Sequence, residues 1–367
     1  MNGNSASQRY AAVCIGVVAA ALLATAQSAS LTISETGSTL IYPLFQSWVA
    51  AYAKVDSSLR ITDAATGSGA GIDQAIAGRV QIGTSDAYMS DNQAMAHANI
   101  LNIPLAISAQ TVDANIPELH GGTLKLSGPV LAGIYTGKIR MWDDGQIAAM
   151  NRGVSLPHRA IVPVRRAEGS GDTFIFTQYL TFSTCVSGES DDPACHGTWE
   201  DTVGYGTTVS WPSAPGELAA PGNNGVLAAI ARTPYSVGYL GTSYEAEAAK
   251  DNLIVAMLKN QAGNFLLPTP ATVTAAAAEL TPRTPPDERL TLVFAPGADS
   301  YPLINYEYAV VSEKQPNQQT ATAISNFLLW CISPQGGSAS SFLDPVHYIA
   351  LPTPIRARSE IQIVKIQ

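Results

Sequence analysis

Residues 161–174 read IVPVRRAEGSGDTF, and this stretch indicates the class of fold more directly than any other. The β-branched run Ile161 to Val164 predicts a strand, and the pattern from Thr173 to Leu180 predicts a helix. Between them lie Gly169, Ser170 and Gly171, small residues suited to a tight turn that caps a helix. Strands that alternate with helices in this way are typical of α/β proteins. The stretch therefore predicts an α/β fold.

Two other segments share this design of strand, small-residue turn and helix start. They are Thr36 to Thr39 and Thr66 to Gly71. The first turn of a helix has unpaired N–H groups and a partial positive charge, so each turn is a candidate anion site. Helix capping alone also selects Ser, Thr and Gly, and one such turn would be explained by capping. Three turns in one chain, one of them preceded by Arg165 and Arg166, favour anion binding over capping alone.

The rest of the chain continues the alternation of short strands and helices. We predict strands at 31–34, 60–62, 80–83, 236–240 and 306–311, and helices at 39–54, 70–77 and 318–332. Thr281 to Asp287 reads as a linker because it is rich in Pro and Thr. No internal repeat of fixed period is visible.

Composition excludes two broad classes of protein. Only 13% of the 367 residues are charged and 46% are hydrophobic, which excludes intrinsic disorder. A formal net charge of −9 argues against a nucleic-acid-binding protein, which needs a basic face. The length predicts two domains of ordinary size.

Residues 1–26 have the layout of a secretory signal peptide. Arg9 precedes an apolar run from Ala11 to Ala26, which is shorter than the roughly 20 residues of a membrane-spanning helix. A buried N-terminal helix is the alternative. A lipid anchor on Cys14 is not expected, because Val13 precedes this cysteine and the apolar run continues beyond it.

Export would allow the remaining cysteines to oxidise. Cys185 and Cys195 flank a loop rich in Ser, Gly and Asp, which favours a local disulfide. A metal site that includes His196 is the alternative, but this cluster supplies three ligands and no obvious fourth. Cys331 lies on the apolar stripe of a predicted helix and reads as a core residue.

No motif specific for catalysis is present. The glycines from Gly67 to Gly71 lack both the later glycine of a dinucleotide fingerprint and the lysine of a P-loop. Neither Ser68 nor Ser170 lies in the G-x-S-x-G pattern of a hydrolase nucleophile. The five histidines are scattered along the chain.

Several motifs resemble, in the same order, those of the PstS family, the substrate-binding proteins of bacterial phosphate ABC importers. The likeness covers essentially the whole chain after residue 26 and is closest in pattern to the longer actinobacterial members. Its motifs are Gly37 to Thr39, Gly67 to Gly71, Ile82 to Ala87, Ile134 to Ile139, Trp142 to Asp144, Val164 to Phe174, Gly204 to Val209, Val237 to Tyr239 and Leu343–Asp344.

The resemblance implies a two-lobed periplasmic-binding-protein fold, similar to type II, with the ligand cleft between the lobes. It implies a first lobe of residues 27–106 plus 300–367 and a second lobe of residues 107–299. The chain would cross between lobes near Pro104 to Ser108 and near Tyr301–Pro302, and this double crossing would act as a hinge.

The resemblance also implies the residues that bind phosphate, with no metal and no cofactor. From the first lobe they are Ser38, Thr39, Leu40 through its backbone, Ser68 and Asp86, and from the second lobe Arg166, Ser170, Gly171 and Asp172. Glu168 is expected to hold the Arg166 guanidinium from behind. Two positions depart from the family pattern: Leu40 replaces a common Phe, and Asp172 replaces a Thr and adds a second carboxylate.

The function implied is that of an exported, monomeric, high-affinity phosphate receptor that delivers its ligand to membrane permease and ATPase subunits. Asp86 would accept the proton that phosphate keeps and sulfate lacks. The alternatives are a secreted phosphatase of PstS type, a surface adhesin with an unused pocket, and a receptor for another oxyanion.

Overall fold

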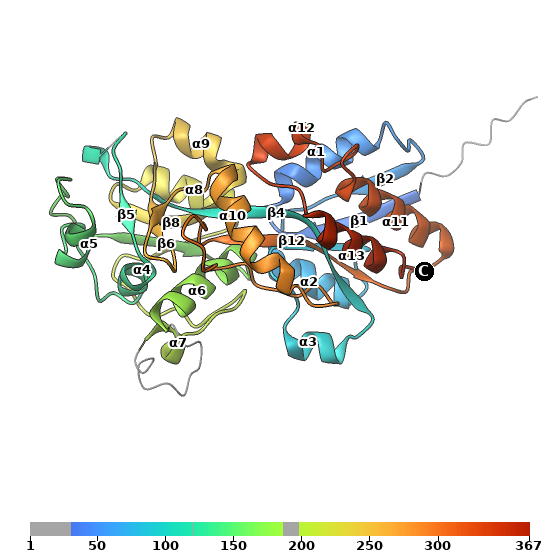
Figure 1. Ribbon diagram of the computed structural model, residues 1–367, viewed down its shortest axis with the longest axis horizontal. Coiled ribbons are helices and arrows are strands. Elements are labelled where there is room, and N and C mark those ends of the chain that lie inside the picture. The colour runs from blue at the N-terminus through green and yellow to red at the C-terminus, as the bar shows by residue number, and fades with distance from the viewer. Residues whose placement is uncertain (1–30, 120, 186–197) are drawn as a thin grey trace, which may run out of the picture.

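The computed structural model describes residues 31–119, 121–185 and 198–367. Nine strands within these ranges form one sheet, in the order β2-β1-β3-β12-β4-β8-β6-β7, with β9 (Ile254–Val255) also paired to β4. Figure 1 shows two halves side by side along the long axis of the molecule, with β4 and β12 running between them. The predicted α/β class is confirmed.

The first half combines the beginning and the end of the chain. Its strand β1 (Leu31–Gly37) is parallel to both of its neighbours, β2 (Leu59–Thr62) and β3 (Ile82–Ser85). The helices of this half are α1 (Tyr42–Tyr52), α2 (Ser68–Ile76), α3 (Asp91–Ala96), α11 (Gln318–Ile332), α12 (Ser340–Leu343) and α13 (Thr353–Ile363).

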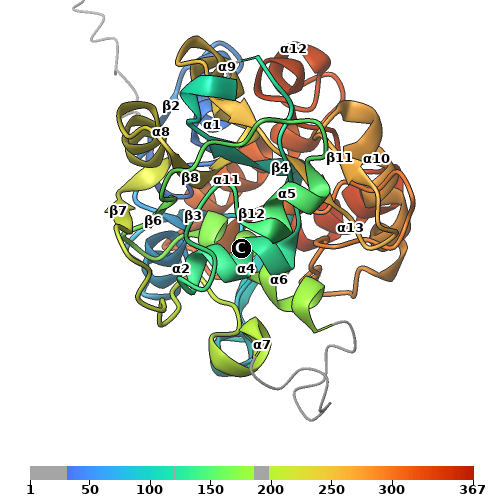
Figure 2. The same cartoon turned by 90° about the vertical axis from the view of Figure 1, so that its left-hand side faces the viewer.

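The second half, which faces the viewer in Figure 2, is built from the middle of the chain. Its strand β6 (Val162–Arg166) is parallel to β7 (Leu218–Ala220) and β8 (Ser236–Gly241). A smaller sheet holds β5 (Lys125–Leu126), β10 (Met257–Lys259) and β11 (Phe265–Leu266). The helices of this half are α4 (Gly128–Tyr135), α5 (Gly145–Met150), α6 (Gly171–Thr184), α7 (Trp199–Thr202), α8 (Gly222–Arg232), α9 (Glu245–Lys250) and α10 (Pro270–Leu280).

Two long antiparallel strands join the halves. β4 (Ile100–Ala114) pairs with β12 (Ile304–Ser312) along its first part and with β8 along its last part. β12 in turn pairs with β3 of the first half, and its register with β4 shifts between Glu307 and Tyr308. The sheet is therefore continuous from one half to the other.

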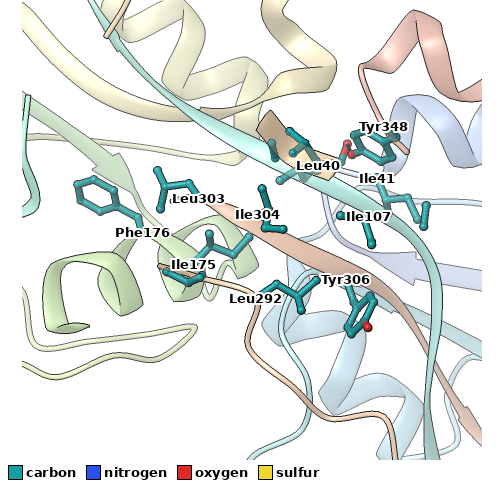
Figure 3. Packing of buried hydrophobic residues seen from close by; sticks show 14 of the residues in the cluster. Leu40, Ile41, Ile107, Ile175, Phe176, Leu292, Leu303, Ile304, Tyr306 and Tyr348 are labelled. Carbon is teal, nitrogen blue, oxygen red and sulfur yellow. Dashed lines mark hydrogen bonds between the residues drawn. The ribbon is translucent and has the colours of Figure 1, made fainter. Parts of the chain in front are cut away.

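The largest hydrophobic cluster follows these joining strands. Figure 3 shows Phe176 of α6 and Leu303 toward the second half, and Tyr306 of β12 and Ile41 toward the first. Leu40 lies at the middle of this cluster and is fully buried.

Most predicted elements are present, with shifted ends. The helix expected at 39–54 begins only at Tyr42, because residues 38–41 form a turn in which the Ser38 hydroxyl accepts hydrogen bonds from the Leu40 and Ile41 N–H groups. The helix expected at 318–332 has the predicted bounds. The long strand β4 was not predicted, nor were α10 and α13.

The segment after α10 lies against the first half. The Thr284 hydroxyl is 2.8 Å from the hydroxyl of Tyr306, and Arg289 forms a 2.8 Å ion pair with Asp91. Ser359 of α13 donates a hydrogen bond to Glu288. The lobe boundaries from the resemblance stay a prediction, because further along the same segment Thr291 donates to Gln178 of α6 and the Ser300 carbonyl accepts from Asn260, both in the second half.

Cys185 is disulfide-bonded, but Cys195 lies outside the described residues, so their pairing stays a prediction. The signal peptide at 1–26 and the alternative metal ligand His196 also lie outside them. Cys331 is a buried free thiol, as predicted. In the described ranges, no helix has the length and apolar character needed to cross a membrane.

Candidate ligand-binding site

The turns singled out in the sequence meet where the two halves touch. Ser38 and Thr39 follow β1, Asp86 follows β3, and Ser170 follows β6, so each lies at the carboxyl end of a parallel strand. Helices α1, α2, α6 and α8 begin around the same place. Crevices at the carboxyl ends of parallel strands are the usual ligand sites of open α/β sheets.

Asp86 is the centre of the first half's contribution and is 2% exposed. Its carboxylate accepts a hydrogen bond from the Ser38 hydroxyl and another, of 3.0 Å, from the Ser68 hydroxyl. The Asp86 N–H donates to the Ser68 hydroxyl at 3.2 Å. Burial and the charge of Asp172 raise the pKa of Asp86 to about 6, although donors around it oppose that rise.

Arg166 is the corresponding centre in the second half and is equally buried. Its Nη1 pairs with Asp172, and its Nε donates to Glu168 Oε1 at 2.8 Å. Burial alone would lower the pKa of Arg166, but the neighbouring carboxylates of Asp172 and Glu168 raise it. The guanidinium is thus charged and is held by carboxylates on two sides. The expected contact between Glu168 and Arg166 is present.

Asp172 is surrounded by donors as well as by Arg166. Gln110 of β4 donates to its Oδ1 at 3.1 Å, and Asn223 of α8 donates to its Oδ2 at 2.8 Å. Burial raises the pKa of Asp172, while Arg166 and these two amides oppose the rise. A second carboxylate therefore lies in the cluster, at the position where the sequence departs from the family.

Several contacts cross directly from one half to the other. Asn223 Nδ2 donates to the Thr39 hydroxyl at 2.9 Å, and the Gly69 N–H donates to the Gly169 carbonyl at 3.1 Å. Gly171 lies so close to Asp86 that a Cβ there would be 2.3 Å from Oδ2. The structure therefore represents the closed arrangement of the two halves.

Two grooves flank this contact on the molecular surface. A groove of about 1020 Å³ is lined by both glycine turns, through Gly69 and Gly169, and by Tyr205. A second, of about 450 Å³, is lined by Thr39, Glu168 and other residues of both halves. Both grooves therefore lie along the boundary between the two halves.

All the predicted phosphate-binding residues lie in this one buried cluster, and Glu168 lies at its half-buried edge. Sequence reasoning missed Asn223, Gln110 and Glu307, which contact Asp172 or Asp86. Asn223 could have been found, because Ala220 to Asn223 repeats the design of a short strand, a glycine and a helix start. Gln110 carries no such signal, since it lies within a continuous buried strand.

The chemistry of the cluster suits a small anion that carries a proton. Helix N-termini, hydroxyl groups and one guanidinium supply donors, and the Asp86 carboxylate supplies a proton acceptor. No group of three or more His, Cys, Asp or Glu side chains in the described ranges could hold a metal ion. In the described residues, the Ser170 hydroxyl contacts Asp172 and the Thr173 N–H, and no histidine there is hydrogen-bonded to it to activate it as a nucleophile.

Comparison with known proteins agrees with this chemistry. The family model of the PBP superfamily domain matches residues 24–335. The phosphate-binding protein PstS of Pasteurella multocida is 33% identical over 331 residues, which are 90% of this chain and 89% of that protein. A phosphate-binding protein of Mycobacterium bovis is 29% identical over 341 residues, which are 89% of this chain and 84% of that protein.

Among solved structures, the phosphate-binding protein from Stenotrophomonas maltophilia is similar with a TM-score of 0.65 and 20% identity. The match covers 90% of this chain and 93% of that one. The expected periplasmic-binding-protein fold is thereby confirmed. Since identity is lower to the Mycobacterium protein than to the Pasteurella one, these figures support the family rather than a special likeness to actinobacterial members.

Proposed function

This chain belongs to the PstS family of phosphate-binding proteins, and from that premise we propose that it is the extracytoplasmic phosphate receptor of an ABC importer. PstS proteins are binding proteins rather than enzymes, which removes the phosphatase alternative. In this role the two halves close over one phosphate ion and present it to membrane permease and ATPase subunits.

The observation that carries the proposal is the position of Asp86 among donors. Its two oxygens accept from Ser38 and Ser68, and the N-terminus of α6 approaches it through Gly171. Phosphate keeps at least one proton near neutral pH, and a carboxylate accepts that O–H. Sulfate has no such proton and would leave the carboxylate facing an unpaired negative charge, so Asp86 discriminates between the two anions.

The remaining residues supply the attraction. Arg166 would exchange its contact with Asp172 for two parallel hydrogen bonds to phosphate oxygens, while Glu168 continues to orient it. Hydroxyls of Thr39 and Ser170 and the first N–H groups of α1, α2 and α6 would complete the donor set. Asp172, no longer paired with Arg166, would accept a hydrogen bond from a second phosphate O–H group. It would therefore favour monobasic phosphate, which carries two such groups.

Replacement of the central carboxylate tests this function. Asp86→Asn keeps the shape of the side chain but removes one acceptor and the negative charge. We expect calorimetric titration to show phosphate affinity lowered by about 10- to 100-fold, together with measurable sulfate binding, since the repulsion is gone.

Asp251→Asn is the matched control, because this exposed aspartate lies beyond α9 and the substitution changes the net charge equally. It should leave both affinities unchanged. Unaltered phosphate affinity in Asp86→Asn, with no gain in sulfate binding, would refute the assignment of Asp86.

A further inference from the structure

Glu307 is a buried acid in the strand that joins the two halves. It lies in β12, beside the register shift between Glu307 and Tyr308, and is 0% exposed. Its Oε1 accepts hydrogen bonds from the Ser108 hydroxyl of β4, at 2.5 Å, and from Asn305 Nδ2, at 3.2 Å. Asn305 Nδ2 also reaches the Asp86 carbonyl at 3.4 Å, so one amide bridges the two acidic residues.

The carboxyl groups of Glu307 and Asp86 are buried neighbours within hydrogen-bonding reach, and each influences the pKa of the other. Two buried carboxyl groups this close together repel each other when both are ionised, and a hydrogen bond joins them only when one carries a proton. Oε2 of Glu307 receives no hydrogen bond from any donor in the described ranges, although Oε1 receives two. An Oε2 that bears a proton and donates it satisfies both observations.

The charges around the pair place the proton on Glu307. Burial, followed by the charge of Asp86, raises the pKa of Glu307 well above its ordinary range. Asp86 has the lower pKa, because donors from Glu307 and Ser38 and the charge of Arg166 counteract its burial. Asp172 of α6, Tyr244 and Tyr348 are further titratable groups around the pair. Burial and the neighbouring acids raise the pKa of both tyrosines.

We propose that Glu307 is a positioning residue for phosphate specificity, a neutral acid that donates a hydrogen bond to Asp86 and keeps it an ionised proton acceptor. This inference rests on the proposed phosphate-binding function. Without this donor, Asp86 would be protonated more readily. A protonated Asp86 would present its own O–H to the O–H of phosphate and could no longer accept a hydrogen bond from it. Asp86, which accepts the hydrogen bond from phosphate, would thus depend on Glu307, which does not contact phosphate.

Two substitutions separate the donor from the charge. Glu307→Gln keeps a donor for Asp86 and an acceptor for Ser108 and Asn305, as the neutral acid does. We expect its phosphate affinity to stay within about threefold of the unmodified chain from pH 5 to pH 8.5. Glu307→Leu removes the donor, so we expect affinity to fall about tenfold near pH 6 and the acidic limb of the profile to move to higher pH.

The pH profile distinguishes this role from a structural one. Loss of packing would lower phosphate affinity equally at every pH, whereas loss of the donor acts most strongly where Asp86 titrates. Glu288→Gln is the control, because Glu288 is another buried acid, hydrogen-bonded to Ser359 and remote from Asp86 in its contacts. Glu288→Gln should leave the pH dependence of phosphate affinity unchanged.

A second readout does not depend on phosphate. Carbon-13 NMR titration of the Asp86 carboxyl in the ligand-free protein should give a higher pKa in Glu307→Leu and an unchanged pKa in Glu307→Gln. A shift in Glu307→Gln comparable to that in Glu307→Leu, or no shift in either, would overturn the inference. Failure of the unmodified chain to bind phosphate would instead refute the proposed function, and the NMR titration would still decide the role of Glu307.

Discussion

Arg166 shows most clearly why one side chain matters more than its neighbour. It is buried and paired with two carboxylates, whereas Arg165 beside it reaches outward to Glu217 and lies over the ring of Trp211. A planar guanidinium can hold a carboxylate behind it and an oxyanion in front of it at the same time. An ammonium group cannot maintain that arrangement.

Arg166→Lys should therefore weaken phosphate binding by about 100-fold, or roughly 2.7 kcal/mol. Arg165→Lys is the matched control and should stay within about threefold, because its guanidinium makes its contacts outside the cluster. Equilibrium dialysis with labelled phosphate measures both. Equal effects of the two substitutions would contradict a special role for the buried Arg166 guanidinium.

Sequence reasoning was most successful for residues of this kind. The glycine turns were found because small residues at a strand-to-helix turn have a direct physical meaning, and Arg166 was singled out through the resemblance to the PstS family. Glu307 and Gln110 were missed because a polar residue within a buried strand carries no local signal. Their partners come from other parts of the chain, and only the fold brings them together.

The helix α6 begins at the point where the two halves are closest. A Cβ on Gly171 would lie 2.3 Å from Asp86 Oδ2 and 2.5 Å from the Ser68 hydroxyl. The helix itself would accept alanine, but the closed arrangement would not. This glycine is therefore required by the approach of the two halves.

Gly171→Ala should lower phosphate affinity by at least about 100-fold and leave the melting temperature of the ligand-free protein unchanged. Gly145→Ala, at the start of α5, is the control, since a Cβ at this glycine would have no neighbouring atom within 4 Å. Calorimetry and thermal unfolding measure the two effects. Full phosphate affinity in Gly171→Ala would contradict the closed arrangement described here.

Strand β1 carries another buried acid with a consequence for stability. Burial raises the pKa of Glu35 to about 8, although Thr84 and the Ala64 N–H donate to its carboxyl. The folded protein therefore holds this proton more tightly than the unfolded chain. The resulting stabilisation is complete below the ordinary pKa of 4.5 and is lost as the pH rises to about 8.

Urea unfolding should accordingly give a lower free energy of unfolding at pH 8 than at pH 5. Glu35→Gln should reduce this difference by at least about 1 kcal/mol, and other buried acids should maintain the remainder. Glu360→Gln, an exposed position on α13, should not change it. The same pH dependence in Glu35→Gln as in the unmodified chain would show that Glu35 does not hold a proton in the folded state.

The strand β4 could not be recognised from an alternation of apolar and polar residues. All fifteen residues of β4 are buried, so the alternation that identifies a half-exposed strand is absent. Its run also contains Pro104 and several polar residues, which obscure a continuous apolar pattern. The alternation of strands and helices was sufficient for the α/β class but not for the strand that joins the halves.

The molecule as a whole is organised for closure. Its halves share one sheet through β4 and β12, and a segment after α10 returns to contact the first half. The proposed binding residues come from both halves, so a ligand between them would favour the closed form. The crossing strands are the place where opening would bend the chain.

The most direct test of this account is calorimetric titration of the purified chain from residue 27 with phosphate and with sulfate. We expect one phosphate per chain, bound at micromolar concentration or below, and sulfate bound at least about 100-fold more weakly, because only phosphate offers a proton to Asp86. Equal affinity for the two anions, or no phosphate binding, would contradict it.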